Sequence, residues 1–85
     1  MNIAEVKATL RRGDLHADDA RQTLLRVLVH VQQAESLALR TCHDSEDDLV
    51  KTGLERLDEA LSWAHEGVDL LRSAADAAAA YASTL

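Results

Sequence analysis

The side chains of this chain that could bind a metal ion are its histidines, its one cysteine and its carboxylates. The four histidines are His16, His30, His43 and His65. None is four residues from another histidine or from Cys42, the spacing at which two ligands share one side of a helix. Cys42 and His43 stand beside acidic residues, but adjacent ligands without a second pair do not surround a tetrahedral ion. We therefore expect no metal site and no metal cofactor.

The remaining polar residues also lack the spacing of known catalytic groups. The chain has no Glu-x-x-His motif of the di-metal carboxylate bundles, no glycine-rich phosphate loop and no Ser/His/Asp grouping. The carboxylates of Asp18, Asp19, Glu55, Asp58 and Glu59 fall on outward positions without an opposed partner, so they do not form an acid/base pair. We predict no catalytic and no cofactor-binding residues, and a protein that is not an enzyme.

Composition predicts the elements that carry these side chains. The 85 residues include no proline and three glycines, and 47% are hydrophobic, mostly alanine and leucine, which favours long helices. A net charge of −6 argues against nucleic-acid binding, which needs a basic stripe. No apolar run approaches the length of a membrane span, and a single cysteine fits a reducing compartment. We expect a cytoplasmic, all-α protein with no membrane or nucleic-acid partner.

Both halves of the chain carry apolar or small residues at alternating spacings of three and four, the heptad pattern of packed helices. In the second half these are Val50, Leu54, Leu57, Leu61, Ala64, Val68, Leu71, Ala75, Ala78, Ala82 and Leu85. In the first half they are Ile3, Val6, Leu10, Gly13, Ala17, Ala20, Leu24, Val27, Val31, Ala34, Ala38 and Thr41. The two patterns predict two long helices that pack along one internal seam.

The expected architecture is one domain, residues 1–85, that forms a long antiparallel two-helix hairpin. Asn2 followed by Glu5 has the form of a capping box, and Ser45 can cap the second helix. We predict a helix over about 3–42, a turn over about 43–45 and a helix over about 46–83. Because the heptad phase continues through Gly13, we place this glycine inside the helix, opposite Ala75, as a point of close approach. The alternative is a monomeric three-helix bundle broken near Gly13.

A further apolar stripe runs along the second helix beside the seam and would remain uncovered in a two-helix hairpin. Its residues, with one from the first helix, are Leu37, Leu49, Gly53, Ala60, Trp63, Gly67, Leu70, Ala74, Ala77 and Tyr81. We predict that this stripe is an interface and that two hairpins dimerise through it into a four-helix bundle. A smaller cluster, Leu25, Leu28, Val29 and Leu39, lies on another side of the first helix and forms either a second contact or scattered exposure.

The two ends of the chain read Met1-Asn2-Ile3-Ala4-Glu5-Val6 with Leu10, and Ala79-Ala80-Tyr81-Ala82-Ser83-Thr84-Leu85. In these residues the chain resembles a family of small, uncharacterised actinobacterial α-helical hairpin proteins. The resemblance implies a helical hairpin with an alanine-rich final helix, and it implies no activity. A second similarity, to the hairpin proteins of type VII secretion, lacks both of their signals. Trp63 is within a helix and not at the turn, and the fourth residue after Tyr81 is Leu85 where those proteins have an acidic residue.

The sequence therefore predicts a non-enzymatic protein–protein interaction module that self-associates, most simply as a homodimer, through the stripe around Trp63. One alternative is an adaptor or passenger for a secreted partner in a type VII-like system, bound through the same residues. Another alternative is a metal-binding helical bundle, which would need histidines from symmetry-related copies.

Overall fold

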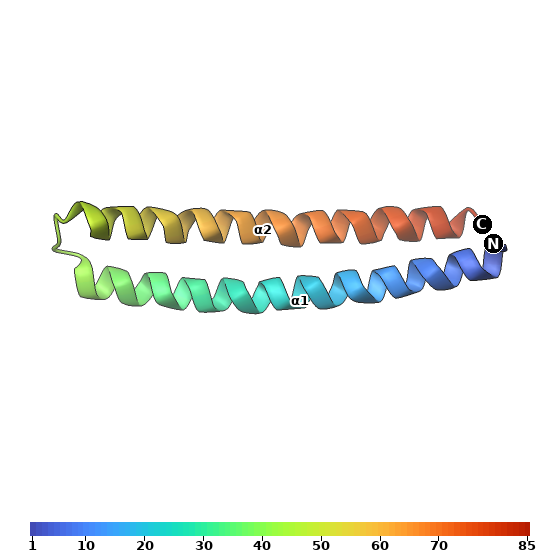
Figure 1. Ribbon diagram of the computed structural model, residues 1–85, viewed down its shortest axis with the longest axis horizontal. Coiled ribbons are helices and arrows are strands. Elements are labelled where there is room, and N and C mark those ends of the chain that lie inside the picture. Colours follow the sequence, from blue (N-terminus) through green and yellow to red (C-terminus); the bar gives the residue numbers. More distant parts are fainter.

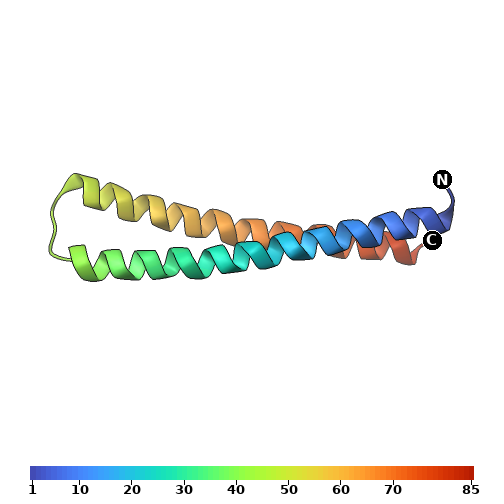
Figure 2. The same ribbon diagram turned by 60° about the horizontal axis from the view of Figure 1, so that its bottom comes forward.

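The computed structural model covers residues 1–85 and is a helical hairpin, as the sequence predicted. Helix α1 spans Ile3–Cys42 and helix α2 spans Asp48–Ser83, with no strands. The two helices lie side by side along a molecule that measures 62 × 16 × 15 Å, with both termini at one end and the turn at the other (Figure 1). Seen after rotation about the long axis, they cross at a shallow angle, so each helix wraps around the other (Figure 2).

Helix α1 is a single continuous helix, which excludes a break at Gly13 and the three-helix alternative. It begins where the capping motif predicted, because the Asn2 Oδ1 atom accepts a hydrogen bond of 2.8 Å from the backbone N–H of Glu5. Gly13 has no positive φ and remains in the helix. Its flanking turns are rich in alanine, leucine and arginine, which are good helix formers and offset the cost of one glycine.

The turn is longer than predicted, and α2 begins two residues later than expected. Asp47, and not Ser45, is the N-cap of α2: its Oδ1 atom accepts a hydrogen bond of 2.8 Å from the backbone N–H of Leu49. The Ser45 Oγ atom instead accepts from the backbone N–H of Asp47 at 3.2 Å. An aspartate satisfies the free N–H groups at a helix start as well as a serine does, and its charge suits the helix dipole.

The core of the hairpin is thin and is centred on Leu28 of α1 and Ala64 and Val68 of α2, the three residues that are buried. Leu24 of α1 and Leu61 of α2 pack against this cluster. On α2 the seam follows the predicted heptad positions. All of them from Val50 to Ala82 are buried or half-buried.

On α1, however, one of the two rows of the seam lies one position further along than predicted, which corresponds to a partial rotation of α1 about its axis. The row at Leu10, Ala17, Leu24, Val31 and Ala38 is half-buried, as expected. Its companion row is not the predicted Gly13, Ala20, Val27, Ala34 and Thr41, all of which are exposed, but Arg21, Leu28, Glu35 and Cys42. Leu28 is 5% exposed and its neighbour Val27 is 42% exposed. Both rows keep heptad spacing. The Leu28 side chain packs with Ala64 and Val68 of α2, and it is longer than the side chain of Val27 that the pattern placed there.

The glycines correct a second prediction. Gly13 is not a point of close approach, because a Cβ atom added there would meet nothing within 4 Å. The close approach is instead at Gly67, where an added Cβ would lie 3.0 Å from the Leu24 Cδ1 atom. The seam of α1 leaves Gly13 exposed, whereas Leu24 stays in the seam, as predicted, and packs against α2 at Gly67.

This difference between the glycines predicts opposite outcomes for the same substitution. Gly13→Ala should raise the free energy of unfolding by about 0.5–1 kcal/mol, because alanine is the better helix former and its methyl group meets open space. Gly67→Ala gains the same helix propensity but pushes on Leu24, so its unfolding temperature should fall below that of Gly13→Ala. Thermal melts followed by circular dichroism measure both, and a higher melting temperature for Gly67→Ala would contradict the packing described here.

Candidate functional site

The surface of α2 beside the seam is apolar and uncovered. Trp63 is 68% exposed and Leu70 is 69% exposed, and Leu49 and Tyr81 are also more than half exposed. Small residues accompany them: Gly53, Ala74 and Ala77 are exposed, and Ala60 and Gly67 are half-buried. Leu37 of α1 is exposed as well. Every residue of the predicted interface is therefore at least partly accessible, and the structure shows no side chain of this chain covering the large ones.

The rotation of α1 extends this surface beyond the residues that the sequence singled out. Gly13, Ala20, Val27, Ala34 and Thr41 were predicted to lie in the seam, but all five are exposed. We use "the apolar face" for these five residues together with the ten of the predicted interface. The apolar pattern placed them in the seam, because the row one position further along has the same heptad spacing but contains the charged residues Arg21 and Glu35.

The α1 and α2 parts of the apolar face lie on the same side of the hairpin. In an antiparallel helix pair, the rows that flank the seam on one side come from corresponding heptad positions of both helices. The side chain of Leu24, which borders the row of Ala20 and Val27, contacts the backbone at Gly67. Nearer the turn, Gly53 and Leu49 line one shallow hollow together with Ala38 of α1. The apolar face is thus continuous across both helices.

The other side of the hairpin is charged. There, Asp18 and Arg21 of α1 line a shallow hollow together with Arg72 and Asp76 of α2. The Arg21 Nη2 atom donates to the Asp18 Oδ1 atom at 2.7 Å. This side is mixed and not wholly polar, because the hollow is also lined by Leu15, which is 67% exposed, and because Leu25 and Leu39 continue the heptad row of Asp18. It differs from the apolar face in carrying both acidic and basic side chains.

The apolar face contains very little charge. Its one interruption along α2 is Arg56, which occupies the heptad position between Leu49 and Trp63. The guanidinium of Arg56 turns toward Glu59, and its Nη1 atom lies 3.0 and 2.9 Å from the two carboxylate oxygens. From Ala60 to Tyr81 the two rows of the face carry no ionisable side chain other than the tyrosine hydroxyl.

The whole molecule exposes more surface than a compact monomer of its size. Its accessible surface is 6414 Å². A folded monomer of 9.3 kDa is expected to expose about 5,000 Å². The excess of roughly 1,400 Å² per chain is larger than the area that each partner buries in a standard protein–protein interface, about 800 Å².

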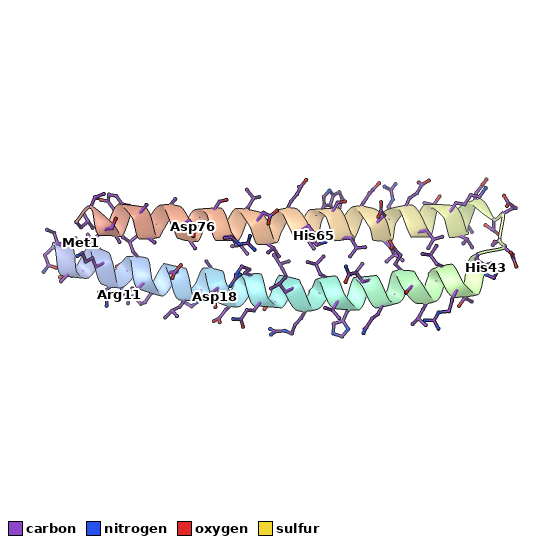
Figure 3. All side chains as sticks on the ribbon, turned by 180° about the vertical axis from the view of Figure 1, so that it is seen from behind. Met1, Arg11, Asp18, His43, His65 and Asp76 are labelled. Carbon is purple, nitrogen blue, oxygen red and sulfur yellow. The ribbon has the colours of Figure 1, made fainter.

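The residues that could bind a metal are spread along the hairpin and do not converge. His43 lies at the turn and His65 lies midway along α2 (Figure 3). The His43 ring contacts only its neighbourhood, with the Nε2 atom 3.2 Å from the Asp44 Oδ2 atom and the Nδ1 atom 3.2 Å from the Arg40 carbonyl oxygen. No group of three or more histidine, cysteine or acidic side chains is placed to hold a metal ion.

The smaller cluster on the first helix is divided by the structure. Leu28 belongs to the core, so its assignment to a surface cluster was wrong, whereas Leu25, Val29 and Leu39 are exposed. Leu25 and Leu39 share a heptad row with Asp18 on the charged side of the hairpin, and Val29 lines a shallow hollow together with Leu37 of the apolar face. Leu25, Val29 and Leu39 are a second, smaller set of exposed side chains.

Comparison of the chain with known protein families, with curated proteins and with solved structures finds no match. Neither helix is long and apolar enough to cross a lipid bilayer. The feature of this molecule that indicates a function is the apolar face.

Proposed function

We propose that this protein is a non-enzymatic interaction module of the cytoplasm that dimerises through the apolar face into a four-helix bundle. The observation that carries the proposal is the exposure of Trp63 and Leu70 on the part of the apolar face, Ala60 to Tyr81, that has no charged side chain on α2. Fully burying large apolar side chains contributes about 1.5–3 kcal/mol each. Two copies of each are present in a symmetric dimer.

The dimensions of the face suit this role. The hairpin is 62 Å long and 16 Å wide. One such side is large enough to bury the approximately 800 Å² per partner that stable interfaces require. The hairpin also needs a partner energetically, because a core of three buried residues is small even for a domain of this size, and small domains often gain stability by oligomerising.

A second copy explains the composition of the face better than a membrane or a nucleic acid does. The net charge of −6 opposes binding to anionic lipids and to phosphate backbones. Glycine and alanine at heptad spacing let two helices approach closely, and the few large side chains between them supply the buried area. Adaptor function for a secreted partner would use the same face, but no observation favours it over self-association.

Trp63 is the only tryptophan and reports directly on this face. On dilution of the wild-type protein, we expect its fluorescence emission to move to longer wavelength as the dimer dissociates and water reaches the indole. Sedimentation velocity over the same concentrations should show the mass falling from two chains to one, with the same midpoint. A chain that stays monomeric at high micromolar concentration, with constant emission, would contradict the proposal.

A further inference from the structure

We propose that the second copy binds in the opposite orientation, so that the turn of each hairpin lies beside the termini of the other. The two-fold axis then passes across the helices near Thr23 of α1 and Gly67 of α2. This inference rests on the proposed self-association and adds to it the arrangement of the two chains. Its starting point is that Leu24 contacts the backbone at Gly67, which places the neighbouring residue Thr23 and Gly67 at the same level of the hairpin.

Only two symmetric arrangements bring the apolar faces of two hairpins together. If the axis runs along the helices, both turns lie at the same end and each α1 packs on the partner's α2. If the axis runs across the helices, the turns lie at opposite ends, each α1 packs on the partner's α1, and each α2 packs on the partner's α2. The residues on the face and at its edge distinguish the two.

The size of the side chains along α2 favours the arrangement with the turns at opposite ends. When α2 packs antiparallel on its own copy about Gly67, residues at equal distances on either side of Gly67 face each other. Gly53 then faces the partner's Tyr81, so that a glycine of this row packs against its largest side chain. Trp63 and the partner's Leu70 lie at nearly equal distances as well, and these exposed side chains cover each other. With the turns at the same end, Trp63 would instead face the more polar His30.

The charges that flank the apolar face on α1 are complementary about the same axis. Asp19 and Arg26 lie at nearly equal distances on either side of Thr23, and so do Glu5 and Arg40. All four are exposed, and none takes part in the four ion pairs within the chain. Asp19 can therefore pair with the partner's Arg26, and Glu5 with the partner's Arg40, each pair occurring twice by symmetry.

The two ends of the hairpin also differ in charge. Four carboxylates stand at the turn, from Asp44, Glu46, Asp47 and Asp48. Near the termini, three basic side chains balance three acidic ones: Lys7, Arg11 and Arg12 against Glu5, Asp14 and Asp76. Turns at the same end would place two acidic clusters side by side, and opposite orientation places each cluster near the balanced end of the partner. Glu66 would lie near the partner's Glu66, close to the two-fold axis. A single exposed like-charge pair is outweighed by the four opposite-charge pairs along α1.

A distance between the two turns tests this arrangement. The variant Asp44→Cys is made in a chain that also carries Cys42→Ala, so that the one cysteine at the exposed turn takes a single spin label. Double electron–electron resonance then measures the distance between the labels of the two chains. With the turns at opposite ends, the separation should approach the 62 Å length of the molecule. With the turns together, it should stay below about 30 Å, since neighbouring helices lie 8–10 Å apart.

Ser62→Cys in the same background is the matched control, because Ser62 is exposed, lies near the middle of the hairpin and should give a short distance in either arrangement. A long distance at the turn with a short one at position 62 supports the inference. A dimer with short distances at both positions overturns the opposite orientation and leaves the proposed dimerisation intact. A chain that sediments as a monomer and shows no dipolar signal at either position overturns both.

Discussion

Trp63→Glu is expected to abolish dimerisation, raising the dissociation constant about a thousandfold. The substitution removes the largest exposed apolar side chain and places a charge in the centre of the apolar face. Each of the two symmetric sites loses about 2 kcal/mol of buried area, and about 1.4 kcal/mol corresponds to a tenfold change in affinity. Leaving a carboxylate buried without a partner adds a further penalty. Sedimentation velocity over a concentration series measures the constant.

The matched control for this substitution is Ser62→Glu. Ser62 is the adjacent residue, is exposed and lies on the polar side of α2, so the same added charge should leave the dissociation constant within about threefold of wild type. A dimer of unchanged affinity in Trp63→Glu would show that the interface lies elsewhere on the hairpin. Equal weakening by both substitutions would show that net charge, and not the apolar face, controls association.

Leu28→Ala is expected to lower the free energy of unfolding by about 2–5 kcal/mol, the range measured for large-to-small changes in protein cores. Leu28 is the one buried residue of α1, and it forms the core cluster together with Ala64 and Val68 of α2. Because the core contains so few buried residues, much of the population should be unfolded at room temperature. Chemical denaturation followed by circular dichroism measures the change.

Val27→Ala distinguishes the observed seam from the one predicted by periodicity. Val27 is largely outside the seam, so its truncation should cost less than about 1 kcal/mol at the same protein concentration. If α1 had the seam that its periodicity predicts, Val27 would face α2 and Leu28 would lie at the edge of the seam. A larger loss for Val27→Ala than for Leu28→Ala would therefore contradict the position of α1.

Several features of the fold could be predicted from the sequence because they depend on local interactions. The start of α1 after Asn2 follows from a capping side chain, and its continuity follows from strong helix formers around Gly13. Its end at Cys42 agrees with the end of the heptad pattern at Thr41. The seam of α2 could be predicted because its apolar positions from Val50 to Ala82 continue without a charged residue, whereas the stripe beside them is interrupted by Arg56. The start of α2 could not be placed within two residues, because Ser45 and Asp47 are both competent caps.

The apolar face was partly predictable for the same reason. Trp63, Leu70 and Tyr81 share one side of α2 by helical spacing alone, and a two-helix hairpin has only one internal seam in which to bury side chains. The contribution of α1 was not predictable. Val27 and Leu28 each continue a heptad row, and their spacing to Leu24 and Val31 satisfies the pattern in either case.

The sequence by itself determined two long helices, an antiparallel hairpin and an excess of apolar surface on one side of α2. Only the tertiary structure decided which row of α1 faces α2, and hence that Ala20, Val27 and Ala34 extend the apolar face across both helices. The physical reason is that periodicity specifies the residues sharing one side of a helix, whereas rotation about its axis depends on the partner. Leu28 packs on Ala64 and Val68, and Leu24 packs against Gly67. Contacts with α2 therefore determine which of two rows of equal spacing lies in the seam.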